Sequence, residues 1–225
     1  MKKDVFIPCI VALLVFAGCK KDNKEPPSFV ISGNVEHNGQ ALSVRSGGVE
    51  LELWQYGYQL RNKIPVYLNQ DGTFNAKVFP GNYKLTLLRG NGPWADKTDS
   101  LDVEVKGTST VKVPVSPYFI IKNVNYQRNG NAITATFNLE RVNTTKPLEL
   151  ARIYIGQTLI TDQNNNLANA SKAASAIIDL SQPVTITANI PAASASRDFV
   201  FVRVGVKTAG VAELLYSQPL ELKLK

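Results

Sequence analysis

The chain has 225 residues, of which 44% are hydrophobic and 19% are charged, with 15 glycines and 12 prolines. This is an ordinary globular composition, which excludes a disordered or collagen-like chain and allows one large domain or two small ones. Cys9 and Cys19 both fall among the first twenty residues, and His37 is the single histidine. Residues 20–225 therefore cannot contain a disulfide, a cysteine-ligated zinc or iron–sulfur site, a thiol nucleophile or a multi-histidine metal site.

Residues 1–18 predict a signal peptide. Lys2 and Lys3 give a positive start, and the apolar run at 5–17 is shorter than the about 20 residues that a membrane span needs. The residues before Cys19, Ala17 and Gly18, are small and resemble a bacterial lipoprotein cleavage box. That resemblance implies that Cys19 is acylated and anchors the protein in the outer-membrane lipid. The alternative is a plain secreted protein in which this cysteine has no role.

Residues 19–28 predict the lipidated cysteine and an extended tether, because charged residues and paired prolines cannot pack a core. A charged segment just behind the cysteine also resembles the surface-export signal of Bacteroidetes lipoproteins, which implies display on the cell surface. The formal net charge is +7, but the basic residues are scattered and form no run of five or more. We therefore expect no nucleic-acid partner.

Alternation of apolar and polar residues with period two predicts strands from residue 29 onward. The clearest runs lie at 49–54, 101–106, 111–115, 133–140 and 184–190, and the more apolar run at 199–206 predicts a central strand. Turn signals separate the strands, namely Asn38-Gly39, Asp71-Gly72, Pro80-Gly81-Asn82, Lys106-Gly107 and Asn129-Gly130. The Ala-rich stretch at 167–178 is the helical candidate, interpreted as a short helix or a loop.

Two prolines, Pro114 and Pro117, interrupt the strand pattern near the middle of the chain. We therefore predict an all-β protein with two consecutive antiparallel β-sandwich domains, at 29–115 and 118–225.

The first half resembles a carboxypeptidase-regulatory-like domain, which implies a transthyretin-like β-sandwich. Five segments carry this resemblance in order: Val30-Ile31-Ser32-Gly33-Asn34-Val35, Asn38-Gly39-Gln40-Ala41-Leu42, Gly48-Val49-Glu50-Leu51-Glu52-Leu53, Asp71-Gly72-Thr73-Phe74 and Phe79-Pro80-Gly81-Asn82-Tyr83-Lys84-Leu85.

The second half resembles the immunoglobulin-like C-terminal domain of a Bacteroidetes two-domain lipoprotein family with no assigned function. The segments that carry this resemblance are Tyr118-Phe119-Ile120 and Gly130-Asn131-Ala132-Ile133-Thr134-Ala135-Thr136-Phe137. The family tends to accompany glycan-uptake systems of the starch-utilisation type. The resemblance thus implies a TonB-dependent transporter and a glycan-binding lipoprotein as partners.

No phosphate loop, nucleophile elbow or histidine pair is present, so we expect neither a cofactor nor enzymatic activity. Glu50 and Glu52 lie two apart on one strand face, about 7 Å between Cα atoms, a spacing that could suit a glycosidase pair. A solvated strand face makes the same pattern far more often, and neither acid has an evident means of raising its pKa. The oxygen-rich loop from Asp162 to Asn166 lacks the acids and the glycine of a calcium loop and is interpreted as a polar loop.

Aromatic residues provide the candidate binding site. Trp54, Tyr56 and Tyr58 continue the parity of Glu50 and Glu52, so rings and carboxylates are expected on one wet strand face. Rings stack on the C–H faces of sugars and carboxylates accept hydrogen bonds from hydroxyls, which is the chemistry of a glycan site. The alternatives are a bulge or a register shift at Gly57, or burial of the rings under the second domain.

Trp94 and Asp96, in a Gly/Pro-rich stretch, complete the candidate set for a glycan or a partner protein. A Trp on such a loop is either a loop anchor or an exposed stacking surface.

Taken together, the sequence predicts a non-enzymatic outer-membrane surface lipoprotein, accessory to a glycan-uptake system, that binds oligosaccharide or docks on its partner proteins. The alternative is a structural or adhesive surface protein whose β-sandwiches serve as spacers, because such folds support both roles.

Overall fold

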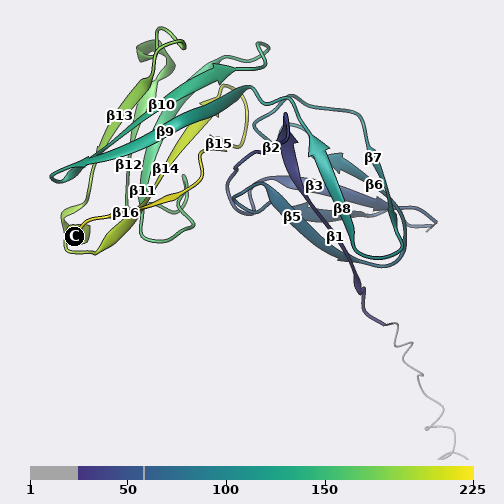
Figure 1. The fold of residues 1–225 in the computed structure, drawn as a ribbon. Helices are drawn as coiled ribbons and strands as arrows, with labels where there is room; N and C mark the ends of the chain where they lie inside the picture. The colour runs from purple at the N-terminus through teal and green to yellow at the C-terminus, as the bar shows by residue number, and fades with distance from the viewer. Residues whose placement is uncertain (1–24, 58) are drawn as a thin grey trace, which may run out of the picture.

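The computed structural model describes residues 25–57 and 59–225. The predicted signal peptide, Cys19 and Tyr58 lie outside the described residues. Within them the protein is all-β, as predicted, with sixteen strands and two short 3-10 helices, η1 (Ala174–Ala176) and η2 (Ala192–Ser194). The strands form two domains that lie side by side (Figure 1).

The first domain is built from two sheets of four strands. In one, which we call the β1 sheet, β1 (Phe29–His37) pairs antiparallel with β2 (Gln40–Ala41) and β5 (Thr73–Val78), and parallel with β8 (Ser109–Pro114). The other, the β3 sheet, is antiparallel and has the order β4 (Lys63–Tyr67), β3 (Glu50–Gln55), β6 (Gly81–Leu87) and β7 (Leu101–Val105).

The second domain repeats the two-sheet plan with different strands. Its β10 sheet has the order β13 (Val184–Asn189), β10 (Ala132–Arg141) and β9 (Phe119–Asn129). Its β14 sheet has the order β12 (Ala168–Ala173), β11 (Leu148–Gly156) and β14 (Phe199–Thr208), with β15 (Leu215–Tyr216) and β16 (Leu220–Lys223) both paired to β14. The predicted central strand is confirmed, because β14 has paired strands on both sides.

Alternating apolar residues form a separate core in each domain. Leu51, Leu53 and Phe74 are buried in the first, and Ile133, Phe137 and Val202 in the second. Most strands therefore bury one face between the two sheets of their domain and leave the other face for solvent or for a neighbouring element.

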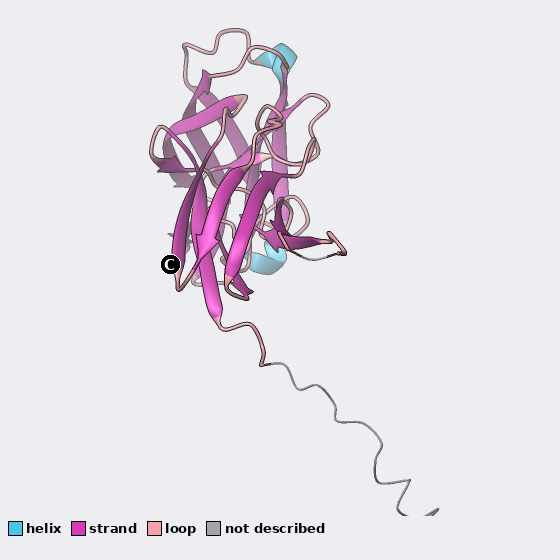
Figure 2. Ribbon diagram, turned by 90° about the vertical axis from the view of Figure 1, so that its right-hand side faces the viewer, coloured by secondary structure: helices cyan, strands magenta, loops and turns pink. Residues whose placement is uncertain are grey.

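The helical candidate at 167–178 is wrong as a helix and wrong as a loop. Half of it forms β12, which pairs with β11 as an edge strand, and three residues form η1 (Figure 2). Burial along β12 alternates between half-buried and exposed, which is a strand period. The helix propensity of alanine is a weak preference, and the ladder with β11 overrides it.

Arg203, on β14, joins the two domains. Its side chain is fully buried, and its Nη2 donates to the carbonyl oxygens of Val44 at 2.9 Å and Gln70 at 3.0 Å, both in the first domain. Its Nε donates to Ser217 O at 2.7 Å within the second domain. Burial lowers the pKa of Arg203 to about 10, so the group still carries its charge at neutral pH.

Further contacts surround this arginine. Its guanidinium lies 4.4 Å from the centre of the Tyr216 ring, and Tyr216 N donates to Ser43 O across the junction at 2.9 Å. Arg45 makes a two-pronged ion pair with Glu213, at 3.0 Å from Nε and 2.5 Å from Nη2. The first-domain residues in these contacts lie in the segments between strands, at one end of that sandwich.

We predict that Arg203→Met destabilises the protein by about 2–4 kcal/mol, because the carbonyl groups at the junction lose a buried charged donor. Urea unfolding measures the change, with Arg89→Met, an exposed position after β6, as the control. A loss below about 0.5 kcal/mol, within the range of ordinary surface substitutions, would show that the junction does not depend on this side chain.

Candidate functional site

The outer face of β3 carries the predicted aromatic residues. Leu51 and Leu53 are fully buried, whereas Glu50, Glu52 and Trp54 alternate with them and point to the other side. The pairing of β3 with β4 and β6 shows no register shift, so the predicted parity is confirmed up to Trp54.

Tyr56 follows β3 and keeps its place beside β6, because its amide donates to Asn82 O at 3.1 Å. It is 44% exposed and shares a hollow with Trp54. The possible register shift at Gly57 falls beyond these two rings. The second domain does not cover them, because the junction hydrogen bonds and ion pairs between the described residues come from other segments.

Trp54 stands between two hollows in this face. The smaller hollow, of about 180 Å³, is lined by Trp54, Gln55, Tyr56, Arg61, Lys84 and Thr86. The larger, of about 390 Å³, shares Trp54 and Thr86 with it and extends to Arg89 and Lys97. The indole ring is therefore presented to two adjoining hollows.

Cross-strand hydrogen bonds fix the indole ring. Its Nε1 donates to Thr86 Oγ1 at 3.2 Å, and that hydroxyl lies 3.3 Å from Glu52 Oε2, to which it donates. Tyr56 is flanked by two cations, with Lys84 Nζ at 5.9 Å and Arg61 Cζ at 6.0 Å from its ring centre. A ring held in this way loses little conformational entropy when a ligand stacks on it.

The two predicted carboxylates are already paired. Lys63 Nζ donates to Glu50 Oε1 at 2.8 Å and to Glu52 Oε1 at 3.1 Å, and these bonds raise the pKa of Lys63. Each carboxylate keeps further lone pairs that a hydroxyl could reach. In this structure, however, Glu50 and Glu52 neutralise the charge of Lys63, and Glu52 also orients the Thr86 hydroxyl.

Of the two alternatives for Trp94, the exposed stacking surface is wrong and the loop anchor is correct. This residue is 3% exposed, packs in the core of the first domain and forms a bridge with Pro117 at the start of the second. Gly92 explains the burial: a Cβ there would come within 2.2 Å of the indole, so the missing side chain leaves room for the ring. Trp94 is thus the loop anchor.

Asp96, the other loop candidate, is exposed, and its Oδ1 accepts a hydrogen bond from Gly90 N at 2.7 Å. This bond closes the loop on itself, and Asp96 lines neither hollow.

The other residues considered for catalysis or metal binding form hydrogen bonds within the fold. His37 is half-buried, and its Nδ1 donates to Val115 O at 2.9 Å. Asp162 is buried, and its Oδ1 accepts from the amides of Asn164 and Asn165, as in a polar turn. Among residues 25–57 and 59–225, no group of three or more His, Cys, Asp or Glu side chains is placed to hold a metal ion.

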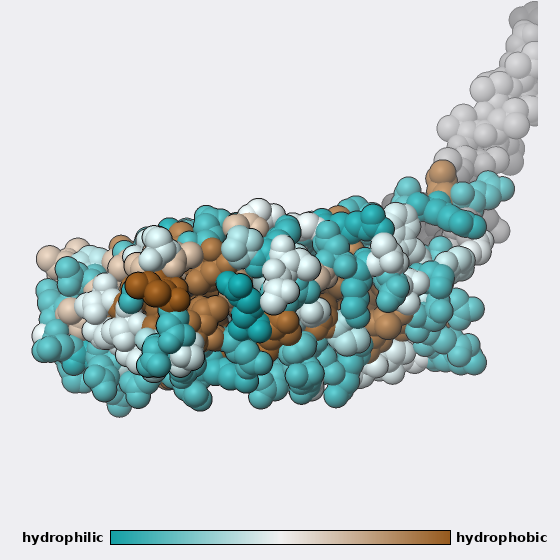
Figure 3. Space-filling model, turned by 90° about the horizontal axis from the view of Figure 1, so that it is seen from above, coloured by the Kyte–Doolittle hydropathy of each residue, from teal (hydrophilic) through white to brown (hydrophobic). Residues whose placement is uncertain are grey.

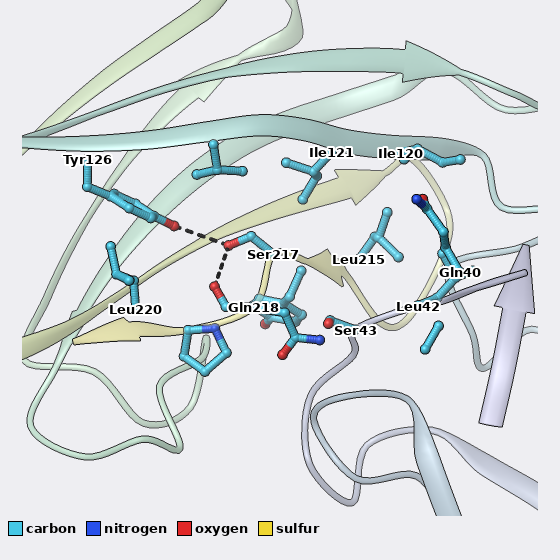
Figure 4. Close-up of a pocket in the computed structure, with 14 residues that line it drawn as sticks. Gln40, Leu42, Ser43, Ile120, Ile121, Tyr126, Leu215, Ser217, Gln218 and Leu220 are labelled. Atoms are coloured by element: carbon cyan, nitrogen blue, oxygen red, sulfur yellow. Dashed lines mark hydrogen bonds between the residues drawn. The ribbon is translucent and has the colours of Figure 1, made fainter. Parts of the chain in front are cut away.

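A third cavity, of about 360 Å³, lies at the domain junction (Figure 4). It is lined mainly by apolar side chains of β9 and of the segment 215–220, together with Leu42 and Ser43. Two of its hydroxyl groups are satisfied, because the Ser217 hydroxyl donates to Gln218 O at 3.2 Å and lies 3.1 Å from the Tyr126 hydroxyl. Burial raises the pKa of Tyr126 to about 12. This cavity has no charged lining residue and carries less binding chemistry than the β3 face.

Sequence reasoning missed the partners that neighbouring strands supply. Lys63, Lys84 and Thr86 meet β3 only through strand pairing, and Arg61 and Arg89 lie in loops. The sequence contains these residues, but no local sequence pattern predicts which strands pair with one another and therefore which side chains meet.

Two surface findings bear on partners. Within the described part of the chain, no helix has the length and apolar character needed to cross a membrane. Seen from above, the apolar surface is divided into separate patches by hydrophilic side chains (Figure 3).

These observations define the class: a two-domain all-β protein with an aromatic, charged face on its first domain. Residues 29–116 match the model of the DUF3823 N-terminal domain, described as a protein of unknown function. Residues 119–220 match that of DUF3823_C, described as a domain of unknown function. The chain belongs to the DUF3823 family.

Solved structures agree with this assignment. A DUF3823 family protein of Bacteroides ovatus is 35% identical with a TM-score of 0.82, and one of Parabacteroides merdae is 32% identical with a TM-score of 0.81. A Bacteroides uniformis protein described as a candidate carbohydrate-binding protein is 19% identical with a TM-score of 0.72, which shows a shared fold. Each alignment covers 88% of this chain and 100% of the other. No curated protein matches the chain.

Proposed function

We propose that this protein is a non-enzymatic carbohydrate-binding protein that holds oligosaccharide on the outer face of β3. The observation that carries the proposal is the position of Trp54, fixed by Thr86 and placed between two adjoining hollows. Two hollows on either side of one ring suit two consecutive sugar units, one of them beside the half-exposed ring of Tyr56.

The comparison with the Bacteroides uniformis protein supports the proposal weakly, because the likeness at 19% identity extends to the fold alone. The stronger support is the chemistry of the face itself. Sugars need a flat apolar surface flanked by hydrogen-bonding groups, and Trp54, Tyr56, Gln55 and Thr86 supply both at the same hollow.

The proposal includes a place in the cell. We propose anchoring in the outer membrane through acylated Cys19, with display at the cell surface. There the protein would serve a glycan-uptake system and dock on its TonB-dependent transporter and glycan-binding lipoprotein. Cys19 precedes the described residues by only a few positions, so the first domain would be the one nearer the membrane.

A spacer role is the second candidate, favoured by one observation. The fully buried Arg203 and the Arg45–Glu213 pair join the domains, as a rigid stalk would require. The hollows around Trp54 have no purpose in a spacer, so the two roles differ in whether Trp54→Ala changes any binding.

We predict that Trp54→Ala weakens oligosaccharide binding by about five- to tenfold, since stacking on one ring is worth about 0.5–1.5 kcal/mol and the ring serves both hollows. Calorimetry after a glycan-array screen measures the change. Phe199→Ala, which removes a 41% exposed ring from the second domain, is the matched control. Chemical unfolding of both variants shows whether the fold is intact. Unchanged affinity in a folded Trp54→Ala protein, or no binding to any glycan, would contradict the proposal.

We predict that Cys19→Ala releases the protein from the membrane fraction and abolishes labelling by palmitate, because no thiol remains to be acylated at that position. Cell fractionation with Cys9→Ala as the control measures this. Protease treatment of intact cells then tests surface display, which full protection of the wild-type protein would rule out. A Cys19→Ala protein that remains membrane-bound would overturn the anchor.

A further inference from the structure

The two hollows beside Trp54 have an excess of positive charge. Arg61 and Lys84 line the smaller one, and Arg89 and Lys97 line the larger one. Glu52 is the one carboxylate in either described lining, and it is already paired with Lys63 at 3.1 Å. The lining therefore presents four cations and no unpaired anion.

The two arginines are available to a ligand. Arg89 is exposed and makes no ion pair, hydrogen bond or ring contact with any described residue. Arg61 is also exposed, and its contact in the described part of the chain is the Tyr56 ring, at 6.0 Å. Within the described residues, neither arginine makes an ion pair that would stabilise the fold, so folding does not explain why both lie beside these hollows.

The two lysines are held more closely but remain near the hollows. Lys84 pairs with Asp102 at 2.7 Å, yet the Asp102 side chain is 79% exposed, so the pair contributes little and can exchange its partner. Lys97 Nζ donates to Pro114 O at 3.1 Å, which leaves its charge uncompensated.

We propose that this face binds an acidic oligosaccharide. One sugar ring stacks on Trp54 or Tyr56, and a carboxylate or sulfate on the same or the next sugar pairs with Arg61 in the smaller hollow or Arg89 in the larger. The planar guanidinium group matches both anions with two parallel hydrogen bonds. This inference rests on the proposed function and names the substrate class of the same site.

The test compares each acidic sugar with its own neutral form. Tetragalacturonate is titrated beside its methyl ester, and a sulfated galactan oligosaccharide beside its desulfated form. We expect at least one acidic form to bind about tenfold more tightly than its neutral partner, and the preference to shrink as salt rises from 0.05 to about 0.5 M. The pair that shows the preference identifies the anion.

The outcomes separate this inference from the proposed function. Equal binding of neutral and acidic forms overturns the inference and leaves carbohydrate binding intact. A glycan-array screen and titrations without any binding overturn both. Single-stranded oligothymidylate is the remaining probe, because stacking with positive charge also suits nucleic acid. If it binds as tightly as the acidic sugar, the face is a general polyanion surface and the inference is wrong.

Variants assign the preference to residues. Whichever of Arg61 and Arg89 pairs with the anion, its substitution by Gln should reduce the preference for the acidic form by about three- to tenfold, as expected for loss of a charge-assisted hydrogen bond at an exposed site. Lys223→Gln removes the same charge from exposed β16 in the second domain and should leave the preference unchanged. A preference that survives both arginine substitutions, or falls equally in Lys223→Gln, contradicts the assignment.

Discussion

A fully buried guanidinium group lies among the contacts that join the two domains of this protein. Arg203 leaves β14 and reaches carbonyl oxygens of the first domain, where it meets no carboxylate at hydrogen-bonding distance among the described residues. Burying a charge is costly unless donors and acceptors are matched. The matching acceptors come from both domains, so the charge is stabilised only when the domains are together.

This junction determines which surfaces remain free. It uses the segments between strands at one end of the first sandwich, including Val44 and Gln70, and not the faces of its sheets. The outer face of β3 is therefore left open to solvent although a second domain packs nearby. Trp54 and Tyr56 are held in place by β6 and the loops of their own domain, which makes the proposed binding face independent of the interdomain contact.

The sequence predicted the period of the strands well because burial of alternate residues is a local property. The fold class, the hairpin at Asn38 and Gly39, and the parity of Trp54 follow from it. The edge strand β12 was missed because its alanines reveal their strand period only beside β11. The sequence could not choose between a buried and an exposed Trp94, because the space that Gly92 leaves for the ring appears only in the folded loop. The cations around Trp54 depend on strand pairing, which no local pattern contains.

The chain has two tryptophans, and the structure gives them opposite environments. Their indole N–H signals in a two-dimensional NMR spectrum therefore report separately on the β3 face and on the core of the first domain. On titration with an oligosaccharide that binds, we predict that the Trp54 indole signal shifts and that the Trp94 signal stays in place. A ligand that shifts neither signal, or shifts Trp94 alone, would show that the β3 face is not where the sugar binds.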